Sequence, residues 1–223
     1  MNKITTLCLC ISLMTVFSCN PASETKEAAV PTEAELPSDE ELAQIGIQKM
    51  GEWTSYWTSK GANLDFNNFT LAQEHTYETT EWPGENLVAS ESPLKEYQIP
   101  HPGKEGVVDI YGYKLLLNED GEVSYNTDAE VVYYKPNGMR ERLLFIGPSG
   151  VFEDAVWISE EELLVSGHIQ KENGFSPVLW LIKPQEHKFT VYENSFSTPD
   201  YVSDSFLRIK LKNLNFPSET SSE

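Results

Sequence analysis

Cysteine is scarce in this sequence. Three cysteines occur in 223 residues, and all of them lie within the first 19 positions, as Cys8, Cys10 and Cys19. Exported domains often carry disulfides, but no cysteine after Cys19 is present to form one. The rest of the chain therefore excludes a disulfide bond and a Cys–His catalytic pair.

Basic residues are also few. The chain has 16 Lys and Arg against 35 Asp and Glu, which gives a formal net charge of −19. A surface of that sign repels DNA, RNA and acidic phospholipids, so we expect no nucleic-acid partner. It permits a basic protein partner without requiring one, because a strongly negative surface also keeps a protein soluble.

A hydrophobic run long enough to cross a membrane is the third feature that the sequence lacks. The uncharged stretch from Ile4 to Phe17 is shorter than the roughly 20 apolar residues that a transmembrane helix needs, and Asn20-Pro21 ends it. Lys3 before this stretch and the small residue Ser18 after it complete the layout of a secretory signal peptide. We therefore expect residues 1–18 to be an export signal.

The four residues Val16-Phe17-Ser18-Cys19 resemble the lipobox of bacterial lipoproteins. In that family the thiol at the cleavage point is diacylated before the leader is removed. The resemblance implies lipidation at Cys19 and attachment to the membrane of the cell envelope through this N-terminal lipid. Each buried CH₂ contributes about 0.8 kcal/mol, and two acyl chains hold a protein stably at a membrane. Losing Lys3 with the leader lowers the net charge from −19 to −20.

The residues after Cys19 bear on the location of the protein. In enterobacterial lipoproteins an Asp directly after the lipidated cysteine implies retention in the inner membrane, and by that similarity Asn20 favours the outer membrane. Whether the domain faces the periplasm or the cell surface stays open. Residues 19–37 are rich in Pro, Ala, Glu, Ser and Thr, a composition that buries little, so we expect a flexible linker.

The sequence after the linker predicts one helix followed by strands. Ser38 and Glu41 form a capping-box pattern, which predicts a helix over 39–50 that can continue toward Tyr56. From Asp65 onward, aromatic and β-branched runs are separated by turn residues, as in a mainly β domain. The predicted strands are Phe66–Thr80, Leu94–Ile99, Val107–Leu117, Ala129–Lys135, Met139–Ile146, Ala155–Ile158, Leu163–Ile169, Val178–Lys183, Lys188–Glu193 and Phe206–Leu211.

These patterns predict a mainly β fold of antiparallel sheets with one N-terminal helix. The sheets are expected in an open sandwich, with an incomplete propeller-like arrangement as the alternative. We expect a single domain over 38–216 and a disordered tail over 217–223. The segments Asn118–Gly121 and Lys135–Gly138 end in Asp-Gly and Asn-Gly, which predicts a tight hairpin turn at each.

A weak internal repeat has a spacing of 48 residues, because Val131–Pro136 aligns with Leu179–Pro184. A repeat of this length built from about four strands resembles a propeller blade, although closed propellers have roughly 4–8 blades. Chance similarity between two hairpins is the alternative. The segments Gly147–Trp157 and Asp109–Tyr113 are similar to segments of uncharacterised lipoproteins of the Bacteroidota. That resemblance would cover residues 95–193 and implies no activity.

Patterns typical of catalysis or metal binding are not evident. No histidine stands at metal-ligand spacing from another His or Cys, and each is expected at the surface or in a turn. A Gly-x-Ser-x-Gly elbow is absent. Glu153 and Asp154 could form an acid–base pair, but consecutive strand residues point to opposite faces, so their carboxylates are expected to diverge. We predict no cofactor, no metal and no enzymatic activity. The histidines are His75, His101, His168 and His187.

Aromatic residues supply the one candidate ligand-binding site. Trp53, Tyr56 and Trp57 lie within five positions, and Trp82 stands beside Pro83-Gly84 in a predicted loop. Flat rings can stack on sugars or anchor a protein interface, but they can equally pack a helix on a sheet. We expect a non-enzymatic, envelope-anchored binding or interaction module whose partner the sequence does not identify, with another envelope protein as one candidate. A glycan- or small-ligand-binding lipoprotein is the alternative, and a hydrolase is third.

Overall fold

The computed structural model describes residues 37–79, 81–86 and 88–217. The predicted signal peptide, Cys19 and all of the linker except Pro37 lie outside the described residues, as does the tail after Pro217. The helices are α1 (Asp39–Lys49), α2 (Gly51–Ser59) and α3 (Ser205–Lys210), and three 3-10 turns are η1 (Phe66–Asn68), η2 (Pro93–Tyr97) and η3 (Pro184–Glu186). None of the helices in this described part combines the length and the hydropathy of a membrane-spanning segment.

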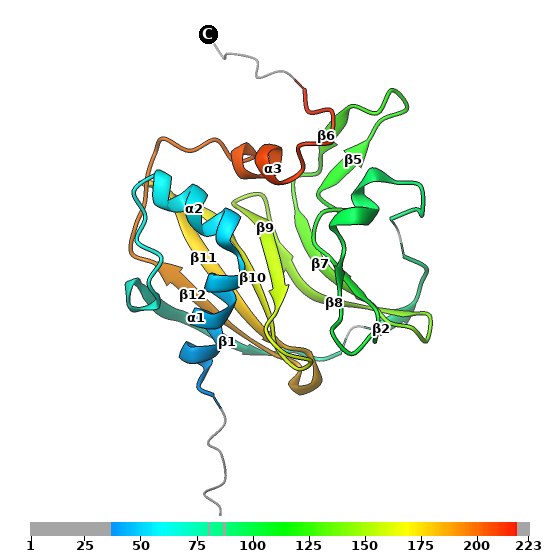
Figure 1. Ribbon diagram of the computed structural model, residues 1–223, viewed down its shortest axis with the longest axis horizontal. Helices are drawn as coiled ribbons and strands as arrows, with labels where there is room; N and C mark the ends of the chain where they lie inside the picture. The colour runs from blue at the N-terminus through cyan, green and yellow to red at the C-terminus, as the bar shows by residue number, and fades with distance from the viewer. Residues whose placement is uncertain (1–36, 80, 87, 218–223) are drawn as a thin grey trace, which may run out of the picture. The chain divides into compact units, whose positions relative to one another are not determined.

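The prediction of a mainly β fold is confirmed, since the described residues contain twelve strands (Figure 1). Every pairing between these strands is antiparallel. The strands are β1 (Phe69–Thr76), β2 (Glu81–Pro83), β3 (Ile99–Pro100), β4 (Val107–Asp109), β5 (Leu115–Leu117), β6 (Val123–Tyr125), β7 (Ala129–Tyr134), β8 (Met139–Ile146), β9 (Gly150–Trp157), β10 (Leu163–Lys171), β11 (Gly174–Lys183) and β12 (Lys188–Asn194).

The strands form two five-stranded sheets and one separate pair. Sheet A has the order β1-β12-β11-β10-β9, sheet B has the order β2-β8-β7-β4-β3, and β5 pairs with β6. The 48-residue repeat corresponds to equivalent positions in the two sheets, because hairpin β7–β8 holds the place in sheet B that β11–β12 holds in sheet A. A strand from residues 69–83 covers the outer edge of each hairpin, β1 on β12 and β2 on β8.

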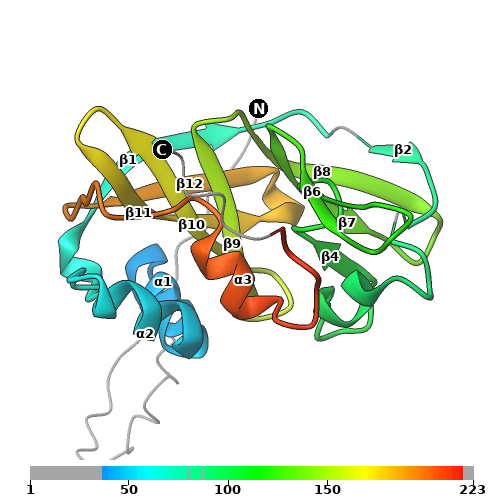
Figure 2. The same cartoon turned by 90° about the horizontal axis from the view of Figure 1, so that it is seen from above.

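The predicted helix start is confirmed atom by atom. The Ser38 Oγ accepts a hydrogen bond from the Glu41 backbone N–H at 3.3 Å, and the Glu41 carboxylate accepts one from the Ser38 N–H at 2.8 Å. Gly46 lets α1 approach sheet A closely, since a Cβ at that position would lie 2.4 Å from Leu164 Cδ2. The helical region breaks at Met50 and resumes as α2, which lies with α1 against one face of sheet A (Figure 2).

Strands β9, β10 and β11 of sheet A are buried on both faces and carry apolar residues in both alternating directions, whereas the edge strand β1 is exposed after Phe69. Leu164, Leu179 and Leu181 belong to the core cluster that includes α1 and α2. Val165 and Trp180 belong to a second cluster that includes residues of sheet B. The helix-side cluster also contains Trp53, Trp57, Tyr201 and Phe206. Sheet A is therefore the middle layer between two core clusters, one shared with the helices and one shared with sheet B.

Three predicted strands were wrong. Phe206–Leu211 is mostly helix α3, because Leu207, Leu211 and Leu214 recur at helical spacing and all enter the core. Leu94–Ile99 is mostly the 3-10 turn η2, which Ser92 caps and in which Pro93 stands at the first positions. Val107–Leu117 is split into β4 and β5, which belong to different sheets. The two predicted hairpin turns are confirmed, with Gly121 and Gly138 at positive φ.

Candidate binding site

The aromatic residues predicted to bind a ligand do not share a surface. Trp53 and Trp57 are both 0% exposed, as the packing alternative for this cluster requires. Tyr56 is half-buried, and its hydroxyl lies 2.5 Å from Ser205 Oγ. Trp82 lies on β2 of sheet B, where the Arg140 guanidinium covers its ring at 4.8 Å. The helix rings pack on sheet A, and Trp82 belongs to a different part of the fold.

Trp53 and Trp57 surround a buried carboxylate that sequence reasoning did not place there. Glu153 on β9 is 0% exposed and accepts hydrogen bonds from the indole N–H of Trp53 at 2.7 Å and of Trp57 at 3.0 Å. It also accepts from His168 Nδ1 at 2.8 Å and from the Tyr201 hydroxyl. Burial alone raises the pKa of Glu153, but His168 and these hydrogen bonds outweigh it and lower the pKa.

A register shift explains why Glu153 reaches the helices. Ser166 pairs with Asp154 and Gly167 pairs with Phe152, so Glu153 is the extra residue of a β-bulge. Its neighbour Asp154 bonds Lys210 of α3 at 2.8 Å, and burial raises the pKa of Asp154 despite this contact. The prediction that the two carboxylates diverge to opposite faces is therefore wrong, since both face helices. Each is bound to its own partners, so they do not form an acid–base pair.

His168 links this carboxylate to a hydroxyl. Its Nε2 lies 3.3 Å from Ser203 Oγ, which gives the carboxylate–imidazole–hydroxyl order of a hydrolase triad. The imidazole is only 1% exposed and is enclosed by the rings of Trp57, Phe175 and Tyr201. A substrate would need access to that imidazole. We therefore interpret the arrangement as a buried hydrogen-bond network of the core and not as a catalytic centre.

His101 begins a turn that ends at Lys104 but is buried, and the expectation that every histidine lies at the surface or in a turn is wrong for His168. These two are 3% and 1% exposed. His101 packs edge-on against Trp157 at 4.6 Å and bonds the Glu160 carbonyl at 2.8 Å. His187 does lie in a turn, and His75 is exposed. Over the described ranges, no group of three or more His, Cys, Asp or Glu side chains could hold a metal ion.

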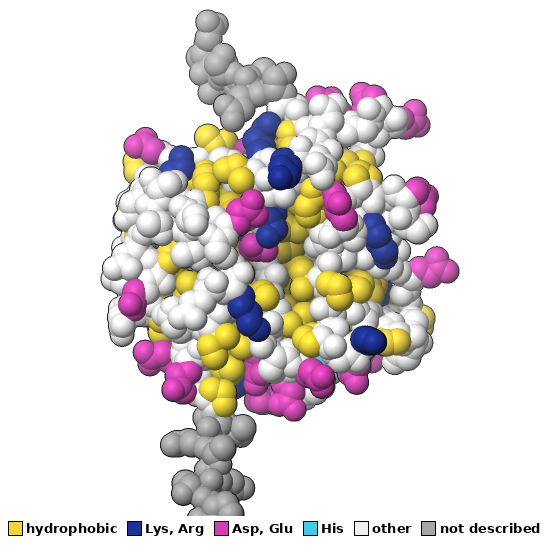
Figure 3. Space-filling model, viewed as in Figure 1, with side chains coloured by type: hydrophobic (Ala, Val, Ile, Leu, Met, Phe, Trp, Pro, Cys, Tyr) yellow, Lys and Arg dark blue, Asp and Glu magenta, His cyan; other side chains and the backbone are white. Residues whose placement is uncertain are grey.

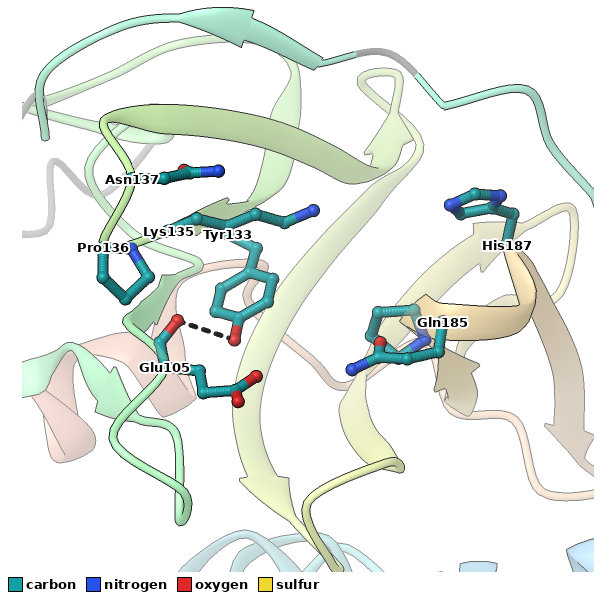
Figure 4. A pocket seen from close by; sticks show the side chains of 8 residues that line it. Glu105, Tyr133, Lys135, Pro136, Asn137, Gln185 and His187 are labelled. Carbon is teal, nitrogen blue, oxygen red and sulfur yellow. Dashed lines mark hydrogen bonds between the residues drawn. The ribbon is translucent and has the colours of Figure 1, made fainter.

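A cleft of about 470 Å³ opens where the repeated turns of the two sheets face each other (Figure 4). Lys135-Pro136-Asn137 follows β7, and Pro184-Gln185 follows β11. Figure 4 shows the two groups on opposite sides of a gap, with the Lys135 side chain extending into it. The repeated Lys-Pro dipeptide was the sequence signal for this site, although it was interpreted only as a fold repeat. The lining residues are Glu105, Tyr133, Lys135, Pro136, Asn137, Pro184, Gln185 and His187.

Lys135 is held in the cleft wall by acidic side chains. Its ammonium contacts Glu81 of β2 and, at 2.8 Å, the Glu141 Oε2 of β8, and it lies 5.8 Å from the Tyr133 ring centre. Glu141 is 1% exposed, and its other oxygen, Oε1, has no hydrogen-bond partner in the described part of the protein. Glu141 is the cross-strand partner of Tyr133. Cross-strand partners share a face, so Glu141 faces the cleft side of sheet B.

A second buried group without a partner lies next to the cleft. Tyr77 follows β1, its backbone N–H donates to the His187 carbonyl at 2.8 Å, and its ring lies 5.7 Å from the imidazole. The Tyr77 hydroxyl is buried and has no hydrogen-bond partner among the described residues. Burial and, to a lesser degree, the Glu141 charge raise its pKa, so the hydroxyl keeps its proton. Two further buried atoms have no hydrogen-bond partner among the described residues, Arg140 Nε and Trp157 Nε1.

Unusual backbone geometry also occurs at the cleft. Among the described non-glycine residues, positive φ occurs at His187, with 51°, and at Lys104, with 62°. His187 lines the cleft, and Lys104 lines a neighbouring cavity of about 490 Å³ that Lys135 and Pro136 also line. Such conformations cost on the order of 1–3 kcal/mol and cluster at functional sites. The structure around the cleft therefore holds His187 and Lys104 in these costly backbone conformations.

No protein-family model, no curated protein and no solved structure matches the chain. The candidate site is therefore defined by its geometry alone.

Proposed function

We propose that this chain is an envelope-anchored, non-enzymatic binding module and that its ligand occupies the cleft between the two Lys-Pro turns. The single observation that carries the proposal is a pair of buried polar atoms without a hydrogen-bond partner among the described residues, Glu141 Oε1 and Tyr77 Oη, whose residues contact the cleft-lining Lys135 and His187. Buried polar groups in native proteins almost always have a partner, so each exception calls for an explanation. A ligand that meets these groups supplies one.

The dimensions of the cleft support binding. Small-molecule sites have volumes of roughly 300–1,000 Å³ and combine apolar walls with a few polar groups. The cleft of about 470 Å³ has Pro136, Pro184 and Tyr133 as apolar walls, and amide, imidazole and carboxylate groups between them. A glycan site on Trp53 and Trp57 is not proposed, because both indoles are fully buried.

The anchor is the second part of the proposal, and the signal-like segment ending at Cys19 supports it. Cys19→Ser should abolish incorporation of a fatty-acid probe and release the protein from the membrane fraction. Retention of the label by this variant would contradict the assignment. A lipidated protein in the outer membrane would present the domain to envelope proteins, which we propose as the partner class.

A cleft-filling variant tests the binding site. The Gln185 side chain is exposed and lines the cleft, so Gln185→Trp should fill it without disturbing the core. Gln170→Trp is the control, since residue 170 is exposed and lies at the opposite end of hairpin β10–β11 from the cleft turn. Both tagged proteins are used to capture partners from solubilised envelopes, and the eluates are compared by mass spectrometry. The proposal requires a near-stoichiometric partner lost only in Gln185→Trp, and identical eluates would contradict it.

A further inference from the structure

The cleft lining has one carboxylate, Glu105, and one ammonium, Lys135, and two further carboxylates contact Lys135 from outside the lining, so the surroundings of the cleft are more acidic than basic. Glu81, Glu141 and the cleft-lining Glu105 stand against the single ammonium of Lys135, which Glu81 and Glu141 already neutralise. Anionic ligands such as phosphates or acidic sugars would meet an excess of like charge here. The remaining classes of ligand group are neutral and cationic.

Glu105 provides an accessible carboxylate in this set. It is exposed, and Figure 4 shows its carboxylate directed into the gap between the two turns. Its backbone carbonyl accepts a hydrogen bond from the Tyr133 hydroxyl at 2.9 Å, which fixes the loop against β7. The structure shows no hydrogen bond or ion pair for the Glu105 side chain among the described residues. The backbone of Glu105 is therefore fixed, and its carboxylate is open to a ligand.

The unsatisfied atoms around the cleft favour a ligand group with many donors. Glu141 Oε1 and the Glu105 carboxylate can only accept hydrogen bonds, and the Tyr77 hydroxyl oxygen can accept as well. Arginine guanidinium and lysine ammonium groups are donors without acceptors. They also match the sign of the Glu105 and Glu141 charges, which raise the pKa of Tyr133 in the cleft wall after the larger effect of burial and against the opposing charge of Lys135.

We infer that the cleft receives a positively charged side chain, arginine or lysine, from a partner protein. This inference rests on the proposed binding function and names the chemistry that the site selects. The whole-chain charge of −19 points the same way, since an acidic surface accelerates encounter with a basic partner. On the face of the protein shown in Figure 3, acidic side chains lie along much of the outline of the molecule.

Charge-matched peptides test the inference directly. A fluorescein-labelled tetra-arginine peptide is titrated with the purified chain at physiological salt, and binding is followed by anisotropy. The control peptide carries citrulline in place of arginine, which keeps the shape and removes the charge. We expect the arginine peptide to bind at least about tenfold more tightly, a difference of about 1.4 kcal/mol.

Variants of the chain separate a specific site from diffuse attraction. Glu105→Gln and Glu141→Gln should each weaken binding of the arginine peptide about tenfold. Glu172→Gln removes the same charge from the exposed β10–β11 turn, at the far end of sheet A from the cleft, and should leave affinity within about twofold. Because Glu105 is exposed, its variant carries no risk of misfolding, and thermal denaturation checks the Glu141 variant.

Other outcomes overturn the inference. Equal losses in all three variants would mean that the peptide senses only net charge. Equal binding of the citrulline peptide would mean that hydrogen bonding, not charge, selects the ligand. Binding of the neutral sugar chitotetraose that disappears in Gln185→Trp would show a glycan site in the cleft. The proposed function would survive this last result. If Gln185→Trp captured the same partner from solubilised envelopes as the wild type, both the proposed function and this inference would be contradicted.

Discussion

Two glutamates in this protein are buried to the same degree and differ in how completely they are bonded. Glu153 on β9 is 0% exposed and accepts hydrogen bonds from four side chains. Glu141 on β8 is 1% exposed, contacts one ammonium and has an oxygen without a partner among the described residues. Burying a carboxylate is costly unless it is paired and hydrogen-bonded. The first site is therefore complete as part of the fold, and the second is the one that a ligand can complete.

The difference follows from what covers each sheet. Glu153 lies under α2 and the segment after β12, which bring Trp53, Trp57 and Tyr201 to it. Glu141 lies on a hairpin next to an open cleft, where it pairs with Lys135 of the same hairpin. The cover over Glu153 supplies several side-chain hydrogen-bond donors to its carboxylate, whereas the junction of the two turns supplies fewer donors to Glu141. Comparable carboxylates thus serve folding on one side and, in our proposal, binding on the other.

The largest expected effect comes from Glu153→Gln. The amide presents an N–H₂ group to a site where every neighbour is a donor, so at least one buried hydrogen bond is lost. Removing one partner of a buried charged pair costs about 3–5 kcal/mol, and we expect a loss of that size. Urea denaturation followed by tryptophan fluorescence measures it. Glu172→Gln, an isosteric change at an exposed turn residue, should change the free energy of unfolding by less than about 0.5 kcal/mol.

The Glu153 effect should fade in acid. Its pKa in the folded protein is lowered from the usual 4.5, so its charge contributes stability that is complete above that value. The contribution is lost as the pH falls through the folded pKa. The stability difference between the wild type and Glu153→Gln should be constant above about pH 5.5 and should narrow below about pH 4.5. A difference that stays constant down to pH 3 would show that the Glu153 charge does not stabilise the fold.

Burial raises the pKa of two other carboxyls, and they act in the opposite direction. Asp109 and Asp154 both bind protons more readily when the protein is folded. Each therefore contributes more to the stability of the protein as the pH falls and less as the pH rises. Both are present in the wild type and in Glu153→Gln. Comparing the two proteins at each pH therefore isolates the Glu153 contribution.

The sequence predicted part of this comparison and missed the rest for physical reasons. The capping box at Ser38 and the turn glycines Gly121 and Gly138 depend on local geometry, so the first helix and two hairpins could be predicted. Strand alternation predicted that Glu153 and Asp154 point to opposite faces, and this was wrong because a bulge arises from pairing with β10 and has no local signature. Glu141 stands in a run of charged residues that looks solvated until β2 and the neighbouring strands cover it.

The next effect concerns the helix cover that completes the Glu153 site. Gly46→Ala should destabilise the protein by about 1–2 kcal/mol, because overpacking costs about 1–3 kcal/mol and the gain in helix propensity returns up to about 1. The added methyl would meet Leu164 Cδ2 at 2.4 Å. Gly51→Ala in α2 is the matched control, since nothing lies within 4 Å of its Cβ. Thermal denaturation should show opposite shifts for the two variants, and a stabilising Gly46→Ala would mean that α1 is packed loosely.

The smallest expected effect is that of Glu141→Gln on stability, and it tests the comparison most directly. This substitution is the same as the one at Glu153, yet it removes a buried charge whose own bonding is incomplete. Lys135 keeps its contact with Glu81 and is 25% exposed, so water compensates part of the lost pairing. We expect a change below about 1 kcal/mol in either direction, measured by urea denaturation beside Glu153→Gln. A loss as large as that of Glu153→Gln would place Glu141 among the residues that hold the fold together and would leave the cleft without its defining group.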